Sequence, residues 1–236
     1  MAPLVTVVTP VLRDSEALRT LLPQVPGIPE VEMVVVDGAA DDELERLIQG
    51  RPGTRLYRTS PGRGHQMNSG ASGAAGEWLL FLHADSRLPA GWLQAFGSLQ
   101  PDVVGGWFEF ALDDDAWQAR LIERLVALRV RLLTLPYGDQ GLFVRRRVFE
   151  SMGGFSELPL FEDVDFVRRL IRHGRVVQLP LSLRTSSRRW TRHGWFRRSI
   201  RNSALVSLYF AGVSPAWLAD RYERRPRKPR GLTVLP

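Results

Sequence analysis

The sequence feature that most constrains the fold is the segment 77–85, in which five consecutive apolar residues precede a histidine and an aspartate. An apolar run of this length, with Gly76 before it and polar groups after it, predicts a short strand that is buried on both faces. His83 and Asp85 are two positions apart and therefore project to the same side of an extended chain. A strand cap is enough to explain such a pair taken alone. The functional alternative is a metal or phosphate site at the carboxyl end of the strand.

The residues before this segment alternate between strand-like and helix-like patterns. Apolar runs at 4–8 and 31–36 and a short run at 55–58 predict strands, while helices are expected at 14–22 and from residue 41 onward. This alternation predicts a parallel sheet with right-handed crossovers, as in Rossmann-type nucleotide-binding domains. The first strand is not followed by Gly-x-Gly-x-x-Gly, which disfavours a dinucleotide enzyme.

The composition excludes several classes of protein. The chain has no cysteine, which rules out disulfides, thiolate metal sites and cysteine nucleophiles and fits a reducing compartment. Neither a signal peptide nor a window of about 18 uncharged apolar residues is visible. We therefore expect a cytoplasmic protein, with peripheral contact at the inner face of the membrane as a variant of that location.

Positive charge is concentrated in the C-terminal third of a chain whose formal net charge is +7. Residues 184–202 carry seven arginines with aromatic residues between them. Such a segment can face nucleic acid, anionic lipid or phosphorylated ligands. Residues 195–218 mix apolar side chains with arginines and are expected to form a helical lid, a dimer contact or an interfacial anchor. The tail at 223–236 is expected to be disordered.

A leucine stripe marks the segment 117–135, which is predicted to be a helix. Core packing is the expected role of the stripe, and a cationic helix lying on a membrane surface is the alternative. The leucines at helical spacing are Leu121, Leu125, Leu128, Leu132 and Leu135.

Two further segments carry chemistry-bearing residues. The glycine-rich stretch 60–70 is expected to be a loop, either a flexible connection to a closely packed small-residue helix or a diphosphate-binding loop that uses the Arg63 fork. Residues 161–166 place three acids at the start of a helix. Capping explains these acids in part, and a carboxylate in a low-polarity cleft would suit a general base.

Six motifs in order resemble the family 2 inverting glycosyltransferases of the GT-A fold and, within them, a bacterial branch of radical-SAM/selenodomain-associated transferases. The likeness runs from Val5 to about Tyr222. The motifs lie at 7–10 together with Glu16, and at 34–38, 61–64, 82–85, 138–141 and 162–165. The resemblance implies an α/β GT-A fold, in which a Rossmann-like nucleotide-binding half is joined to a mixed-sheet acceptor half in one open, mostly parallel sheet with flanking helices. It implies a single domain over 1–222, divided into a nucleotide-sugar half (1–112), an acceptor and catalytic half (113–185) and a basic helical segment (186–222).

The resemblance also implies roles for individual residues on the donor side. Asp85 would bind Mg²⁺ or Mn²⁺ that bridges the donor diphosphate, with His83 at the position of the family's first acid and able to ligate Mn²⁺ or contact the ribose. A UDP-sugar is the favoured donor. The residues implied in donor contact are Thr9, Pro10, Glu16, Asp37, Gly38, Arg63, His83, Ala84 and Arg189.

On the acceptor side, the resemblance implies that Asp163 is the general base of an inverting hexosyl transfer. The residues implied in acceptor binding are Asp139, Gln140, Glu162 and Trp190. The segment 186–190 is similar to the Gln-x-x-Arg-Trp motif of processive synthases, but Ser186 stands at the glutamine position, which favours a single-transfer enzyme. A solvated basic surface with one buried tryptophan is the alternative for that segment. The acceptor is expected to be a small molecule or a lipid-linked group.

Two other functions compete with glycosyl transfer. A nucleic-acid-binding module would explain the basic segment but not the acids at successive strand ends, which repel phosphate chains. A nucleotidyltransferase would need a basic, glycine-rich signature after the first strand, where this chain has residues 9–12. We therefore expect an enzyme with a nucleotide-sugar partner and no nucleic-acid partner.

Overall fold

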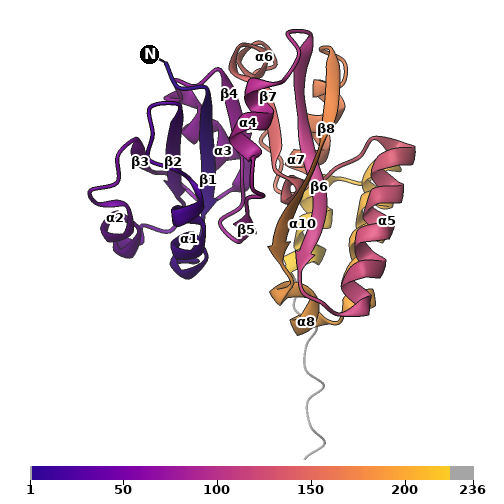
Figure 1. Ribbon diagram of the computed structural model, residues 1–236. Helices are drawn as coiled ribbons and strands as arrows, with labels where there is room; N and C mark the ends of the chain where they lie inside the picture. The colour runs from indigo at the N-terminus through magenta and orange to yellow at the C-terminus, as the bar shows by residue number, and fades with distance from the viewer. Residues whose placement is uncertain (1, 224–236) are drawn as a thin grey trace, which may run out of the picture.

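The computed structural model describes residues 2–223, and the tail predicted at 223–236 lies outside the described residues except for Glu223, which ends the last helix. The chain forms an eight-stranded sheet in the order β3-β2-β1-β4-β7-β6-β8-β5 (Figure 1). The strands are β1 Val5–Val11, β2 Val31–Asp37, β3 Thr54–Arg58, β4 Trp78–Phe81, β5 Ser86–Arg87, β6 Val103–Asp113, β7 Leu142–Arg145 and β8 Arg175–Ser186.

The sheet changes character at β7. Strands β3, β2, β1 and β4 are mutually parallel, β7 is antiparallel to both β4 and β6, and β8 is parallel to β6. The predicted α/β class and the mostly parallel sheet are therefore confirmed. The division at residues 112 and 113 falls inside the end of β6, and both predicted halves share one sheet; this division stays a prediction.

Helices cover both faces of the sheet. The helices are α1 Ser15–Leu21, α2 Asp42–Ile48, α3 Arg63–Ser72, α4 Trp92–Gly97, α5 Trp117–Leu133, α6 Arg146–Ser151, α7 Glu162–Leu170, α8 Arg188–His193, α9 Trp195–Phe210 and α10 Pro215–Glu223, with short 3₁₀ turns η1 Leu22–Gln24 and η2 Gly138–Gln140. One apolar layer joins the sheet to α1, α2 and α4, and the other joins it to α3, α5, α6 and α7. This two-layer burial explains why the parallel strands read as continuous apolar runs.

The glycine-rich stretch expected to be a loop is largely helical, because α3 already begins at Arg63. Small residues let this helix lie directly on the sheet: a Cβ atom at Gly70 would stand 2.5 Å from Cγ1 of Val8. Packing against strands β1 and β2 thus outweighs the low helix propensity of the glycines.

The leucine stripe of α5 does not pack into the core. Its buried residues are Ala119, Ile122 and Val130, whereas Leu125, Leu128 and Leu132 are between 51% and 68% exposed. The face of α5 that carries Ala119, Ile122 and Val130 packs against the sheet, which places the leucines on the solvent side. The expectation of core packing is wrong for these three leucines, and Leu135, which is buried, lies beyond the end of the helix.

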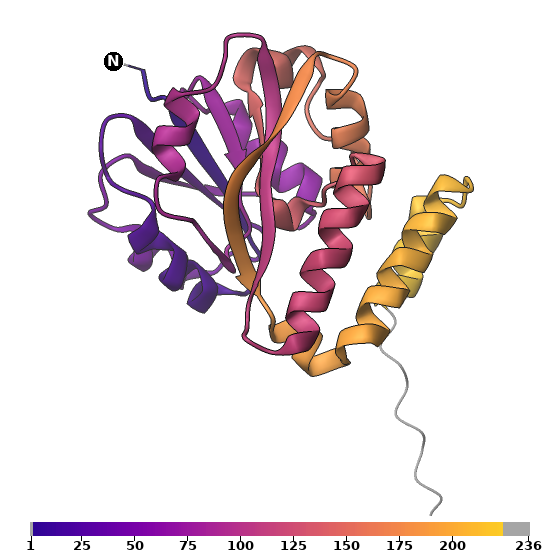
Figure 2. The same ribbon diagram turned by 45° about the vertical axis from the view of Figure 1, so that its right-hand side comes forward.

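The C-terminal segment forms a helical arm beside α5 (Figure 2). Helices α9 and α10 contact each other, and Leu205, Val206 and Leu218 pack against Leu160 and Val164 of the domain. Among residues 2–223, no helix combines the length and the apolar character needed to cross a bilayer.

The carboxyl ends of β1 and β2 are held together by the amide of Gln66 on α3. Its nitrogen donates hydrogen bonds to the carbonyl oxygens of Val11 (3.0 Å) and Val36 (2.9 Å), and the side chain is buried. We expect Gln66→Ala to lower the free energy of unfolding by about 2 kcal/mol, because two buried carbonyl groups lose a donor and a cavity forms. Urea unfolding measures the change. Ser72→Ala, on the exposed end of the same helix, is the control and should stay within about 0.5 kcal/mol of the wild type.

Candidate active site

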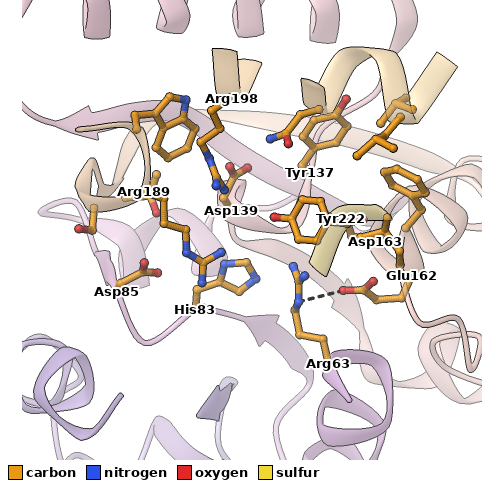
Figure 3. Close-up of a pocket in the computed structure, with 18 residues that line it drawn as sticks. Arg63, His83, Asp85, Tyr137, Asp139, Glu162, Asp163, Arg189, Arg198 and Tyr222 are labelled. Carbon is orange, nitrogen blue, oxygen red and sulfur yellow. Dashed lines mark ion pairs between the residues drawn. The ribbon is translucent and has the colours of Figure 1, made fainter. Parts of the chain in front are cut away.

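A pocket opens at the carboxyl edge of β4 (Figure 3). Its walls come from segments that are distant in sequence: α3, the residues after β4, η2, the start of α7, and helices α8 to α10. Acids, arginines and aromatic side chains face the same space. The sheet edge at which the pocket lies is the usual position of ligand sites in open α/β folds.

His83 and Asp85 both line this pocket, as the strand pattern predicts. Burial, followed by the charges of Arg63 and Arg189, lowers the pKa of His83 to about 3, so the imidazole is neutral at physiological pH. The Asp85 side chain is 14% exposed, and its carboxylate lies 3.8 Å from the Arg188 guanidinium. Figure 3 shows Arg189 beside the His83 ring. A neutral nitrogen ligand and a carboxylate therefore border a cationic wall.

Asp163 is held at the start of α7 by two backbone groups. Its Oδ2 atom accepts a hydrogen bond from the Gly138 N–H (2.7 Å), and Oδ1 accepts one from the Val164 N–H (2.8 Å). Each carboxylate oxygen has a second lone pair, so the group can still accept a proton from a ligand. Phe161, two residues earlier, has a φ of 68°, a left-handed conformation that is costly for a bulky side chain and that recurs at functional sites.

Glu162 forms an ion pair with Arg63 across the pocket floor, with 3.1 Å between Oε1 and Nε. Burial raises the pKa of Glu162 while Arg63 opposes that effect, and the charge of Glu162 in turn raises the pKa of Arg63. The pair couples the first turn of α3 to the first turn of α7. Arg63 is therefore fixed in the pocket by an acid expected on the acceptor side.

The C-terminal helices add a third wall. Arg198 is buried and lies over the Trp190 ring, with 4.8 Å between Cζ and the ring centroid, and burial lowers the pKa of Arg198. Trp190 itself packs against Phe110 at 6.2 Å. Tyr222 of α10 and Asn202 of α9 also line the pocket. The sequence reasoning missed Tyr137, Arg198, Asn202 and Tyr222, and the only signal for Arg198 was the alternation of arginine and aromatic residues in 184–202.

The pocket wall contains only some of the site residues that the sequence predicts. Seven predicted residues lie outside the pocket wall: Thr9, Pro10, Glu16, Asp37, Gly38, Ala84 and Gln140. Thr9, Asp37 and Gly38 lie at the carboxyl ends of β1 and β2, and so at the same sheet edge as His83.

Three of these seven side chains have other contacts. The Asp37 carboxylate accepts hydrogen bonds from the backbone N–H groups of Ala39 and Asp41. Glu16 is exposed and pairs with Arg19, and buried Gln140 donates to the carbonyl of Phe108.

The pocket contains side chains of the types that bind divalent cations. Within residues 2–223 there is no group of three or more histidine, cysteine or acidic side chains arranged to hold a metal. Asp85 and neutral His83 supply two suitable ligands, an oxygen that Mg²⁺ or Mn²⁺ prefers and a nitrogen that Mn²⁺ accepts. The fit is thus one of ligand type, and the charges of Arg63, Arg189 and Arg188 lie beside these two side chains.

Solved structures identify the class of this fold. The chain is similar to the mannosyltransferase PcManGT from Pyrobaculum calidifontis in complex with GDP-Man and Mn²⁺, with a TM-score of 0.66, 19% identity and coverage of 94% of this chain and 70% of that chain. It is also similar to S. aureus TarS 1–349, with a TM-score of 0.59, 17% identity and coverage of 78% of this chain and 60% of that chain. TarS 1–349 in complex with UDP-GlcNAc gives a TM-score of 0.60 at 17% identity, covering 77% and 58%. The fold is thus the GT-A fold of glycosyltransferases, as the sequence predicts.

The family follows from the sequence match. Residues 6–152, more than half of the chain, match the model of glycosyl transferase family 2. The chain belongs to glycosyl transferase family 2, and this membership supports glycosyl transfer from a nucleotide sugar. No curated protein matches the chain. The chain spans 60% of the length of TarS 1–349.

Asp139 is a charge that the native fold holds at a cost. Burial raises the pKa of Asp139 to about 6, Arg129 opposes the shift, and the buried Oδ1 atom has no hydrogen-bond partner within residues 2–223. A raised pKa in the folded state means that stability falls as the pH rises from the unfolded value of about 4 to about 6, and that the full cost is present above that range.

We therefore expect Asp139→Asn, which stays neutral, to raise the free energy of unfolding at neutral pH by about 2–3 kcal/mol. The two proteins should converge at acid pH, below both pKa values. Urea unfolding across pH measures the difference. Asp102→Asn, a surface acid paired with Arg175, is the control and should change stability by less than about 1 kcal/mol. Equal stability of Asp139→Asn and wild type at neutral pH would contradict the stability cost that we assign to the charge of Asp139.

Proposed function

We propose that this protein transfers a hexosyl group from a nucleoside diphosphate sugar, with a UDP-sugar as the favoured donor, to an acceptor hydroxyl with inversion. The observation that carries the proposal is that one pocket holds His83 and Asp85, which follow β4, together with the carboxylate of Asp163, which two backbone N–H groups fix in place. The first group suits the departing diphosphate and the second suits the attacking hydroxyl. The proposal includes the division into a donor half (1–112) and an acceptor half (113–185), and membership of the radical-SAM/selenodomain-associated bacterial branch.

On the donor side, Arg63 and Arg189 line the pocket and would contact the diphosphate, and Asp85 with His83 would hold Mg²⁺ or Mn²⁺. The cation would supply positive charge to oxygens that become more negative as the diphosphate leaves. PcManGT, a structural neighbour, was solved with GDP-Man and Mn²⁺, which supports cation use in this fold. We further propose that Thr9, Pro10, Glu16, Asp37, Gly38 and Ala84 contact the nucleoside at the adjoining strand ends.

On the acceptor side, Asp163 would take the proton of the acceptor hydroxyl as that oxygen forms the bond to the anomeric carbon. The bond from this carbon to the diphosphate oxygen breaks on the opposite face, and its electron pair leaves with the nucleoside diphosphate. Because attack and departure occur on opposite faces, the configuration inverts. We propose that Asp139, Glu162 and Trp190 shape the acceptor site and that buried Gln140 supports it from below.

The acceptor we propose is a hydroxyl on a small molecule or on a lipid-linked group. The apolar part of the pocket wall, Leu160, Phe161, Leu205 and Val206, favours an acceptor with an apolar portion. A cytoplasmic location with peripheral membrane contact through the basic C-terminal segment is part of the same proposal. Nucleic-acid binding is not favoured, because four acids line the pocket beside the arginines.

The role of Asp163 is tested by Asp163→Asn. We expect transfer to fall by at least about 100-fold, because an amide cannot accept the proton, while binding of the nucleoside diphosphate changes little. Product formation with radiolabelled donors and calorimetric titration with UDP and GDP provide the two measurements. Asp165→Asn is the matched control: it lies on the same helix but pairs with Arg169 and Ser156 away from the pocket. Activity of Asp163→Asn equal to that of the control would remove Asp163 from the base role.

The cation site is tested by Asp85→Ala. We expect about tenfold weaker binding of UDP or GDP in the presence of Mn²⁺ and little change in EDTA, because only the cation-mediated part of the affinity depends on this carboxylate. Asp14→Ala is the control, since Asp14 pairs with the same arginine, Arg188, but lies outside the pocket wall. An affinity of Asp85→Ala that equals the wild-type value in both buffers would exclude a cation bridged by Asp85.

A further inference from the structure

Exposed apolar side chains are concentrated on the C-terminal side of the molecule. Of thirteen large hydrophobic residues that are exposed within residues 2–223, ten lie on α5, α9 and α10. Single exposed leucines are ordinary on protein surfaces, but a concentration on neighbouring helices marks an interaction surface. The ten are Trp117, Leu125, Leu128, Leu132, Leu133, Phe196, Ile200, Leu208, Phe210 and Trp217.

Helices α5 and α9 form one continuous part of this surface. They run side by side in both views (Figures 1 and 2), and the rings of Trp117 and Phe196 join them, with 6.0 Å between centroids. On α5, the leucine stripe faces away from the sheet. On α9, Phe196 and Ile200 are exposed while Leu205 and Val206 face inward. We name the solvent-facing residues Trp117, Leu125, Leu128, Leu132, Phe196 and Ile200 the α5–α9 surface.

The α9 part of this surface lies in a long stretch of chain whose charges all have one sign, whereas exposed Asp115 precedes α5. Residues 166–219 contain eleven arginines and no aspartate or glutamate. Arg192 and Arg197 of α8 and α9 are exposed, as are Arg124 and Arg131 beside the leucine stripe of α5. An apolar stripe bordered by arginines is the pattern of helices that lie in the plane of an anionic membrane surface.

We propose that the α5–α9 surface docks on an anionic phospholipid bilayer. Its leucines and aromatic rings enter the boundary between headgroups and acyl chains, and the arginines beside them meet the lipid phosphates. A second copy of this chain fits less well, because a two-fold interface brings the same cationic surface against itself. Nucleic acid accounts for the arginines but leaves the exposed leucines without a role.

Docking in this orientation places the pocket next to the lipid. Helix α9 carries the surface on one side, while Leu205, Val206 and Arg198 line the pocket from its other side. A membrane-borne acceptor would then enter past α9. This last step rests on the proposed function, whereas docking itself needs no nucleotide.

The experiment is co-sedimentation of the full chain with vesicles of phosphatidylcholine, alone or mixed with phosphatidylglycerol. We expect binding to the mixed vesicles that is at least about tenfold tighter than binding to the neutral ones and that weakens in high salt. Leu128→Glu combined with Leu132→Glu should weaken binding to the mixed vesicles by at least about tenfold. Arg192→Glu combined with Arg197→Glu should remove most of the preference for anionic lipid.

Ile28→Glu is the matched control, because Ile28 is an exposed apolar residue outside this surface and should bind as the wild type does. Circular dichroism and urea unfolding confirm that each variant is folded.

Absence of binding to mixed vesicles overturns the proposal, as does binding by the leucine variant that equals wild-type binding. A wild-type dimer that the leucine variant converts to a monomer, with no vesicle binding, assigns the surface to self-association instead. Salt-sensitive binding of short RNA that the leucine variant retains, with no vesicle binding, assigns the arginines to nucleic acid. Because no nucleotide is present, failure here removes only the membrane contact from the proposed function and leaves glycosyl transfer to be judged by UDP and GDP titration.

Discussion

Strand β4 is the element on which the rest of the structure depends. All four of its residues are buried, and it pairs parallel with β1 on one side and antiparallel with β7 on the other. Its aromatic residues anchor the two core layers: Trp78 packs edge-on against Phe96 and Phe143, and Phe81 packs against Phe149, Phe155 and Phe166. A strand fixed from both faces and both edges has little freedom to move. The residues that follow it, His83 and Asp85, therefore enter the pocket from a rigid base, which a binding site requires.

The pocket beside this rigid strand contains groups whose burial or backbone conformation lowers the stability of the fold. Asp139 is half-buried with a raised pKa, Glu162 is buried against Arg63, and Phe161 adopts a left-handed backbone conformation just before Glu162 and Asp163. Strained backbone and buried charge in one small volume are typical of sites selected for function at the expense of stability. The aromatic clusters on both sides of β4 compensate for these local costs.

The parts of the fold that the sequence predicts correctly are those with a local cause. The buried strands, their alternation with helices and the polar groups after β4 follow from apolar runs and turn residues. The interpretation of 60–70 as a loop is wrong because contact of Gly70 with Val8, a tertiary effect, overrides the helix propensity of glycine. The leucine stripe of α5 misleads for a related reason: periodicity identifies an apolar face but not its partner, and the sheet selects the face of Ala119 and Ile122 instead. Arg198 and Tyr222 join the pocket only because α9 and α10 fold back onto the domain, and no spacing in the chain predicts that contact.

The family match covers only part of the pocket wall, and the C-terminal third supplies the rest. The match ends at residue 152, and it contains His83, Asp85 and Arg63, which we propose to contact the donor. Five further residues of the pocket wall lie beyond the match: Asp163, Arg189, Trp190, Arg198 and Tyr222. Because α9 also carries exposed apolar side chains on its outer face, the residues that close the pocket and those that meet the surroundings are parts of one helix. A ligand or surface that shifts α9 must therefore change the pocket wall as well. If the proposed function holds, the strands within the family match would determine the donor chemistry, and the C-terminal helices would determine which acceptor reaches it.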